Sequence, residues 1–262
     1  MSMKVNDFLA MVKKACDVKT LYVMGGFGAP AGYGRNRTRY STNNSYNKQP
    51  ERAALIKAAS DNTFFFDCVG LCKGVLWGWY GDASRVYGGA GYAENGVPDY
   101  DAKGMMFNGC TEQSKDFSNI VPGEFLWLDG HCGIYIGNGL CAESSPKWKD
   151  GVQITAVLNI GKKSGYNGRT WTYHGRLKYV DYSDVKPDPT TDGYKAGSVY
   201  KVICKDTLNI RKDATTGSAI IDALDSGSKV LCESTKKDAA GNTWMKITGW
   251  IAAKYNGEKY VG

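Results

Sequence analysis

The chain has 262 residues, of which 42% are hydrophobic, 12% aromatic and 23% charged, so its composition excludes a disordered protein and allows one or two folded domains. The net charge of +7 is spread along the chain, because residues 1–185 hold 21 Lys and Arg against 17 Asp and Glu, and residues 186–262 hold 12 against 9. Nucleic-acid binders usually concentrate positive charge and membrane spans need roughly 18 consecutive apolar residues, so we expect neither a nucleic-acid partner nor membrane insertion.

The N-terminal segment alternates charged and apolar residues at helical spacing, which predicts an amphipathic helix over residues 6–16. This segment has no continuous apolar core and no small-residue cleavage site, so we expect a protein made in the cytoplasm without a secretory signal. The eight cysteines are too sparse for a disulfide-stapled scaffold. We expect reduced thiols, most of them acting as small buried hydrophobes.

The next segments predict a long loop and then two helices. Residues 27–50 are rich in Gly, Asn, Ser, Tyr and Arg and predict the loop, and a helix is expected over residues 50–60. After an apolar approach, Asp67 is a good N-cap for a buried helix that begins at Cys68. Residues 81–110 are rich in Gly and Tyr and are expected to be largely irregular.

The position of Cys68 at a helix start makes it a candidate nucleophile. Unpaired backbone N–H groups and the helix dipole favour the thiolate there, and the thiolate is the attacking form. The same N–H groups can stabilise an oxyanion. The alternative is a buried cysteine that follows an ordinary cap, and this segment alone leaves both interpretations open.

A thiol nucleophile needs a base, and His131 is the stronger candidate of the two histidines. It opens the middle of three strands predicted at 124–128, 131–136 and 140–144. Glu143, on the third strand, is the candidate acceptor that orients the imidazole. His174 is expected on a later strand and is the weaker candidate.

The register between these strands stays open. A two-residue turn at Asn138–Gly139 would place His131 opposite Pro146. A turn centred on Gly137 would instead place His131 opposite Glu143.

The chain changes character near its C-terminal third. Residues 184–195 are rich in Pro, Gly, Asp and Thr without apolar periodicity, which predicts a linker after a first domain of residues 1–183. Short β-like runs separated by turn residues follow, and they predict a small β-barrel over residues 196–262.

Three blocks of the first domain resemble the signature blocks of NlpC-type cell-wall cysteine peptidases, which are circularly permuted papain-like enzymes. The blocks are FDCVGL (66–71), VPGEFLWL (121–128) and HCGIYIGNG (131–139). The resemblance implies an α+β, papain-like domain in which the helix that carries the cysteine packs on an antiparallel sheet. It also implies a third polar residue twelve positions after the histidine, where Glu143 stands in place of the usual His, Asn or Gln.

The resemblance also suggests substrate-binding residues. LYVMGG (21–26) is similar to a Tyr-Val-Trp-Gly-Gly block of the family, which implies that Tyr22 lines the substrate site. Asp67 matches the family residue that helps to bind the free amine of a stem peptide, whereas Val69 replaces the family's Ser. Residues 27–60 form an insertion relative to the family.

The second domain resembles bacterial SH3-type domains, in the segments TLNIRKDATTGSAII (207–221) and TWMKITGWIAAKY (243–255). That family binds peptidoglycan or other wall polymers. The resemblance implies an aromatic wall-binding platform that includes Trp244, Trp250 and Tyr255. We expect Ile210 and Ile251 to fill the core of this SH3-like all-β barrel.

Together the resemblances imply an endolysin-like, monomeric hydrolase of bacterial peptidoglycan that reaches the wall after lysis or through a separate pore. The bond would be the D-γ-glutamyl–diamino acid amide, or alternatively the N-acetylmuramoyl-L-alanine amide. A mild positive charge suits an anionic polymer such as a cell wall. A second hypothesis is a non-catalytic wall-binding protein with a decayed enzyme domain.

A metal site is the third hypothesis. Zinc prefers paired ligands on turns, whereas Cys68 and Cys72 would lie in a helix. We therefore expect no metal and no cofactor. The cysteines and histidine considered for zinc are Cys68, Cys72, His131, Cys132 and Cys141.

Overall fold

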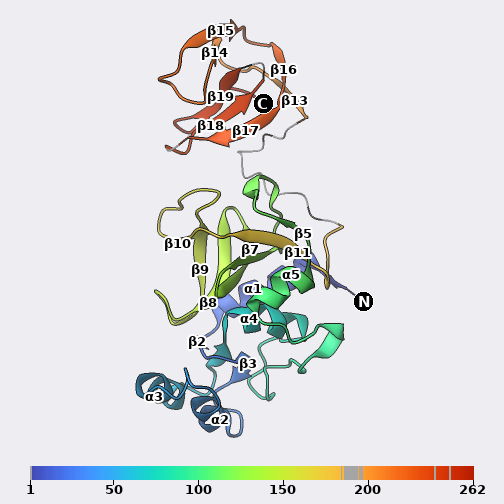
Figure 1. The fold of residues 1–262 in the computed structure, drawn as a ribbon, viewed down its shortest axis with the longest axis vertical. Coiled ribbons are helices and arrows are strands. Elements are labelled where there is room, and N and C mark those ends of the chain that lie inside the picture. Colours follow the sequence, from blue (N-terminus) through green and yellow to red (C-terminus); the bar gives the residue numbers. More distant parts are fainter. Residues whose placement is uncertain (1, 184, 186–193, 195–196, 239, 248) are drawn as a thin grey trace. The chain divides into compact units, whose positions relative to one another are not determined.

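The computed structural model describes residues 2–262 except 184, 186–193, 195, 196, 239, 248 and the side chain of Trp250. The chain divides into two units, Met1–Pro187 and Asp188–Gly262 (Figure 1). The division falls inside the predicted linker 184–195, most of which lies outside the described residues. Across the described part of the chain, no helix combines the length and apolar character needed to cross a bilayer.

The first unit combines helices with a large sheet. Its helices are α1 (Val5–Asp17), α2 (Asn36–Thr42), α3 (Pro50–Ala58), α4 (Cys68–Leu76) and α5 (Ala102–Gly109), with 3-10 turns at Glu94–Gly96 and Phe117–Asn119. The predictions of α1, α3 and α4 are confirmed, because each rests on a local signal such as apolar spacing, an N-terminal proline or a capping aspartate.

The prediction of one long loop over residues 27–50 is wrong, because this segment contains strand β3 (Phe27–Pro30) and helix α2. Residues 81–110 are largely irregular, as predicted, and helix α5 lies at the end of that segment. Tertiary packing explains α2, since Tyr40 is 1% exposed and its ring meets Phe65 edge-on at 5.5 Å between centroids. Packing of this kind overrides weak local propensity.

A seven-stranded sheet forms the centre of the first unit, in the order β10-β9-β8-β7-β6-β11-β5, and only the β9–β10 pair is parallel. Its strands are β5 (Cys110–Ser114), β6 (Phe125–Leu128), β7 (His131–Gly137), β8 (Leu140–Ser145), β9 (Gly151–Val157), β10 (Gly168–Arg169) and β11 (Tyr173–Leu177). Smaller sheets are formed by β2 (Thr20–Tyr22), β4 (Phe64–Phe66) and β3 (Phe27–Pro30), and by β1 (Met3–Lys4) with β12 (Val180–Asp181). The predicted strands at 124–128, 131–136 and 140–144 correspond to β6, β7 and β8.

Helix α4 packs closely against its neighbours. All of its residues after Cys68 are buried, and the helix contacts strands β7 and β8. A Cβ atom at Gly70 would lie 1.9 Å from the Gly26 carbonyl oxygen. The absence of that atom lets the backbone of the β2–β3 connection lie directly against the first turn of α4, which sets the position of Cys68.

The second unit consists of short strands. They are β13 (Val199–Lys201), β14 (Leu208–Arg211), β15 (Ile220–Leu224), β16 (Lys229–Leu231), β17 (Ser234–Lys237), β18 (Thr243–Lys246), β19 (Trp250–Tyr255) and β20 (Glu258–Lys259). Ile210 and Ile251 are 7% and 0% exposed and lie in its core cluster, as predicted. Tyr194, which the sequence assigned to the linker, is 6% exposed and belongs to the same cluster.

The structure corrects one residue of the expected aromatic platform. Trp244 is 1% exposed and its indole N–H donates to Asp238 at 3.0 Å, so its ring is not offered to a ligand. Tyr255 is half-buried at the end of β19. Trp250 begins β19, and its side chain lies outside the described part of the chain.

Candidate active site

Asp67 fixes the start of α4. Its side chain accepts the Gly70 backbone N–H at 2.5 Å, as an N-cap does, and the Gly25 N–H at 2.7 Å. Burial, and then the charge of Cys68, raise the pKa of this carboxyl to about 7. Asp67 therefore joins the cysteine-bearing helix to the segment that follows β2.

Cys68 lies in a setting that favours the thiolate. Its pKa is held well below the usual value by a hydrogen bond with the Cys132 side chain and, against the effect of burial, by His131 and the Val69 backbone N–H. Burial instead raises the pKa of Cys72, one turn further along. Two cysteines of one helix thus differ in chemistry, because only the first lies at the helix start beside a base.

His131 is held between a carboxylate and an aromatic ring. Its Nε2 lies 2.5 Å from Glu143 Oε2, and its ring stacks on Trp171 with 5.7 Å between centroids. Since Nε2 is engaged, Nδ1 is the nitrogen left for the Cys68 thiol. Burial opposes the charged ring, but hydrogen bonds with Cys68 and Glu143 outweigh it and raise the pKa of His131.

A β-bulge places His131 and Glu143 on one face of the sheet. The turn at Asn138–Gly139 pairs Gly137 with Leu140, but the register then shifts by one residue at Ile136. Both turn residues have positive φ, 56° and 73°, as a tight hairpin turn requires. Neither register considered from the sequence is the observed one. Without the shift, the two side chains would point to opposite faces.

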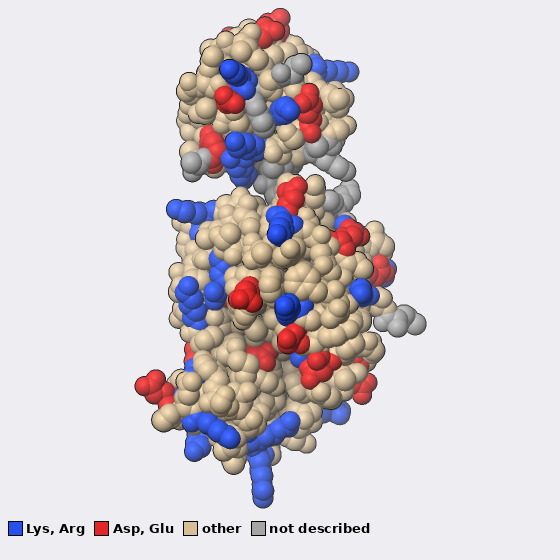
Figure 2. Space-filling view, viewed as in Figure 1, with Lys and Arg blue, Asp and Glu red and all other residues tan. Residues whose placement is uncertain are grey.

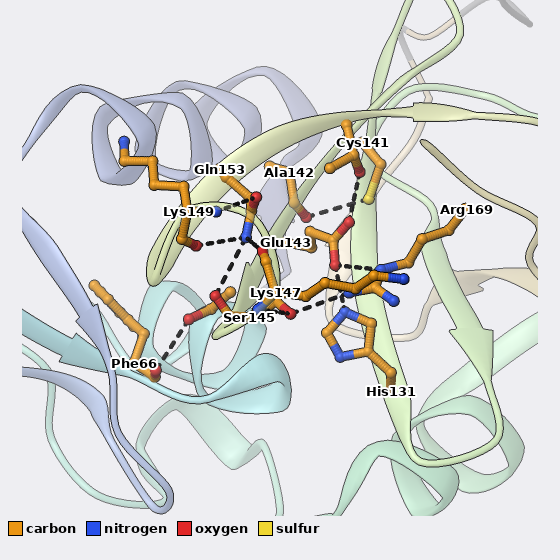
Figure 3. A network of polar contacts seen from close by, with 12 residues as sticks. Phe66, His131, Cys141, Ala142, Glu143, Ser145, Lys147, Lys149, Gln153 and Arg169 are labelled. Carbon is orange, nitrogen blue, oxygen red and sulfur yellow. Dashed lines mark hydrogen bonds and ion pairs between the residues drawn. The ribbon is translucent and has the colours of Figure 1, made fainter. Parts of the chain in front are cut away.

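Glu143 is a fully buried carboxylate, and Figure 3 shows it in contact with His131 and Arg169. Besides His131, it accepts Arg169 Nε at 2.7 Å and Thr155 Oγ1 at 2.6 Å. Burial would raise its pKa, but His131 first, then Thr155 and Arg169, hold the pKa below its ordinary value. Glu143 is therefore ionised where it contacts the imidazole, so the ring is both oriented and stabilised as a cation.

Arg169 is a site residue that the sequence analysis missed. It also donates to Ser145 Oγ at 3.0 Å, and its guanidinium lies 4.8 Å from the centre of the Trp148 ring. No motif marks it, since it lies on the two-residue strand β10. The available signal was Glu143 itself, because a buried carboxylate requires a cationic partner.

The β8–β9 connection beside this site is tied down by Gln153. Its amide nitrogen donates to the carbonyls of Ser145, Lys147 and Lys149 at 3.2, 2.8 and 2.7 Å. Its carbonyl oxygen accepts the Lys149 N–H at 3.2 Å. Figure 3 shows this network next to the His131–Glu143–Arg169 contacts, so the loop and these three side chains form one polar assembly.

A cleft of about 660 Å³ opens over Cys68. Tyr22 and Asp67, the expected substrate-binding residues, both line it. Lys73 of α4 forms an ion pair with Asp99 and donates to the Tyr100 carbonyl at 2.8 Å. These contacts attach Asp99 and Tyr100, which also line the cleft, to the helix. The remaining lining residues are Met24, Gly25, Asn44, Cys68, Val69, Asp101, Ala102, Lys103, Trp127, Asp129 and Gly130.

Residues 27–60, which the resemblance marks as an insertion, support one wall of this cleft. Asn47 is fully buried, and its amide both accepts the Met24 N–H at 3.0 Å and donates to the Met24 carbonyl at 2.9 Å. Arg52 of α3 donates to the Tyr22 carbonyl and forms an ion pair with Asp150. Side chains of residues 27–60 thus hold the backbone of Tyr22 and Met24, two residues that line the cleft.

His174 is placed away from this chemistry. Its Nδ1 is hydrogen-bonded to Glu124 and its Nε2 to the Asp116 carbonyl at 2.8 Å, so both nitrogens are engaged. Within the described residues, no group of three or more His, Cys, Asp or Glu side chains is arranged to hold a metal ion.

We compared the chain with protein families, curated proteins and solved structures. No family model matches the chain, and no curated protein matches it. Among solved structures, the chain is similar to the crystal structure of Ly7917, with 14% identity, a TM-score of 0.28 and coverage of 99% of this chain and 97% of that one. A second structure, Ly7917 with the hydrolyzing product of MDP, gives 15% identity, a TM-score of 0.27 and the same coverage. Scores this low do not establish a shared fold.

Proposed function

We propose that the first unit is an NlpC-type, papain-like cysteine hydrolase that cleaves a stem-peptide amide of bacterial peptidoglycan, and that the second unit is an SH3-type wall-binding module. The observation that carries the proposal is the cluster of Cys68, His131 and Glu143 at the N-terminal end of α4. A decayed enzyme domain would not be expected to retain a buried carboxylate aimed at the base.

The proposed reaction uses the thiolate–imidazolium pair. The Cys68 sulfur attacks the amide carbonyl carbon, and backbone N–H groups of the first turn of α4 stabilise the oxyanion. His131 gives its proton to the leaving amine as the C–N bond breaks, which leaves a thioester. Water then attacks the thioester while His131 takes its proton, and the carboxylic acid product leaves as the thiolate returns.

The proposed bond is the amide between D-γ-glutamate and the diamino acid. The muramoyl-L-alanine amide is the second candidate, and two observations favour it. Val69 lines the cleft and offers no hydroxyl to a substrate amine. Both oxygens of Asp67, the residue expected to help bind such an amine, already accept backbone N–H groups.

Replacing the nucleophile tests the proposal. Cys68→Ala is expected to abolish the clearance of cell-wall suspensions while the chain still folds and sediments with walls. Equal clearance by that variant would exclude the mechanism. Mass spectrometry of digested peptidoglycan identifies the bond, since new diamino-acid amines indicate the endopeptidase and new free lactyl carboxylates indicate the amidase.

A further inference from the structure

The positive charge of the first unit is concentrated in the inserted segment. Residues 27–60 hold six Lys and Arg and a single Glu, whereas the rest of residues 1–185 holds fifteen basic and sixteen acidic residues. The insertion therefore accounts for the entire excess of positive charge in this part of the chain. Figure 2 shows Lys and Arg side chains gathered at the end of the unit that α2 and α3 form.

Four of these six cations are exposed without an ion pair to a carboxylate of the described residues, but one of them, Arg39, donates to the Tyr87 hydroxyl at 2.9 Å. The other three are available to a partner. Arg35, Lys48 and Lys57 are exposed, and none of them forms an ion pair with a carboxylate of the described residues. Arg37 and Arg52, by contrast, are paired with Asp61 and Asp150. We call the surface of Arg35, Lys48 and Lys57 the basic lobe.

The basic lobe is fixed to the cleft. Asn44, four residues before Lys48, lines the cleft, and Asn47 is hydrogen-bonded to the backbone of Met24, which also lines it. Arg52 holds Tyr22 from the same helix that carries Lys57. A polymer held on the basic lobe would therefore lie beside the site where Cys68 acts.

We propose that the basic lobe binds an anionic phosphate polymer of the bacterial wall and so brings the cleft to the stem peptides of the same wall. The proposal rests on the proposed function for the choice of a wall polymer. Exposed cations that no carboxylate neutralises attract closely spaced phosphates, and attraction of this kind weakens steeply with salt. A wall polymer is favoured over other polyanions because it is attached to the structure that carries the scissile amide.

Binding to purified walls tests this surface. The lobe variant carries Arg35→Glu, Lys48→Glu and Lys57→Glu in the full chain with Cys68→Ala, so that the walls stay intact. The control variant carries Lys13→Glu, Lys19→Glu and Lys162→Glu in the same background, which changes the net charge equally at exposed lysines elsewhere on the unit. The probes are walls that keep their phosphate polymer, walls stripped of it, and anionic phospholipid vesicles.

The lobe variant is expected to bind intact walls about tenfold or more weakly than the control variant at low salt, and the difference should shrink at ~1 M salt. The two variants should bind stripped walls equally. Equal binding to intact walls, a difference that persists on stripped walls, or lobe-dependent binding that is stronger to vesicles would each overturn the proposal.

A separate measurement distinguishes this proposal from the proposed function. With Cys68 restored, the lobe variant should hydrolyse soluble peptidoglycan fragments, which lack the polymer, at the wild-type rate. If the wild-type chain hydrolyses nothing, the proposed function fails while the binding result stands. A selective loss of fragment hydrolysis in the lobe variant would show instead that the substitutions damage the cleft, and would count against a polymer-binding role.

Discussion

The Glu143 carboxylate has to meet two demands at the scale of single residues. It lies fully buried, where an ion is costly unless it is paired, and in the proposed mechanism it also attracts a proton-bearing imidazole. Arg169, Thr155 and His131 each form a hydrogen bond with it. The carboxylate therefore stays charged inside the protein, and its charge supports the imidazolium without leaving an unpaired ion.

The pH profile of hydrolysis follows from the shifts at Cys68 and His131. Because the pKa of Cys68 is lowered, the thiolate persists to more acid pH. Because the pKa of His131 is raised, the imidazolium persists to more alkaline pH. We expect a bell-shaped profile of kcat/KM whose acid limb reports the thiol and whose alkaline limb reports the imidazole, both as properties of the coupled pair.

Glu143→Gln makes this prediction sharper. Loss of the negative charge lowers the pKa of His131, so the alkaline limb should move to lower pH, and kcat should fall by about 10²-fold or more. Rate profiles of both chains on a soluble fragment give the measurement. An alkaline limb that does not move would show that Glu143 does not stabilise the imidazolium.

Arg169 is expected to act as a positioning residue. Arg169→Gln removes a cation from Glu143, so the pKa of that carboxyl should rise. The acid limb of the pH profile should then move to higher pH. The loss in kcat is expected to be about 10- to 100-fold, as for other partners that orient a ligand or base, with little change in KM. Arg169→Lys should restore part of the rate, and the exposed Arg85→Gln serves as the control. A loss confined to thermal stability would contradict this role.

At the scale of elements, the sequence predicts what local signals determine. The cap at Asp67, the helix after it and the three strands around His131 all carry such signals, and the structure has them where they were predicted. The register of β7 and β8 could not be predicted, because the bulge at Ile136 leaves no sequence mark. The sequence also did not predict that residues 27–60 support the cleft, because Asn47 and Arg52 do so through long-range contacts with Met24 and Tyr22.

The contact between α4 and the β2–β3 connection gives a prediction with an unusual sign. Replacing a helical Gly with Ala normally stabilises a helix by about 0.5–1 kcal/mol. At Gly70 the added Cβ would lie 1.9 Å from the Gly26 carbonyl oxygen, so α4 would have to move. Gly70→Ala should therefore lower the free energy of unfolding by about 1–3 kcal/mol or more and reduce activity at Cys68.

Denaturant unfolding of the full chain measures this effect. The control is Gly217→Ala, in the loop between β14 and β15, where the nearest atom to the added Cβ is 4.0 Å away. The control should change stability by only a few tenths of a kcal/mol. A stable and fully active Gly70→Ala chain would mean that α4 does not need this close contact.

For the whole molecule, the two units have separate cores, so their contributions can be measured apart. If the second unit binds the wall, as proposed, it keeps the hydrolase unit close to the insoluble polymer. The effective substrate concentration then rises without any change in the chemistry. The expected benefit is therefore large on intact walls at low enzyme concentration and absent on soluble fragments.

A fragment of residues 194–262 tests this division of labour. It has to begin no later than Tyr194, because that side chain packs in the core and its hydroxyl lies 2.7 and 2.6 Å from the carbonyls of Ala253 and Val261. We expect the fragment to sediment with bacterial walls. Residues 1–187 should cleave soluble fragments at the full-chain rate but clear dilute wall suspensions about tenfold or more slowly. Recovery of the fragment only in the supernatant would remove the targeting role, and the hydrolase would then depend on its own surface to reach the wall.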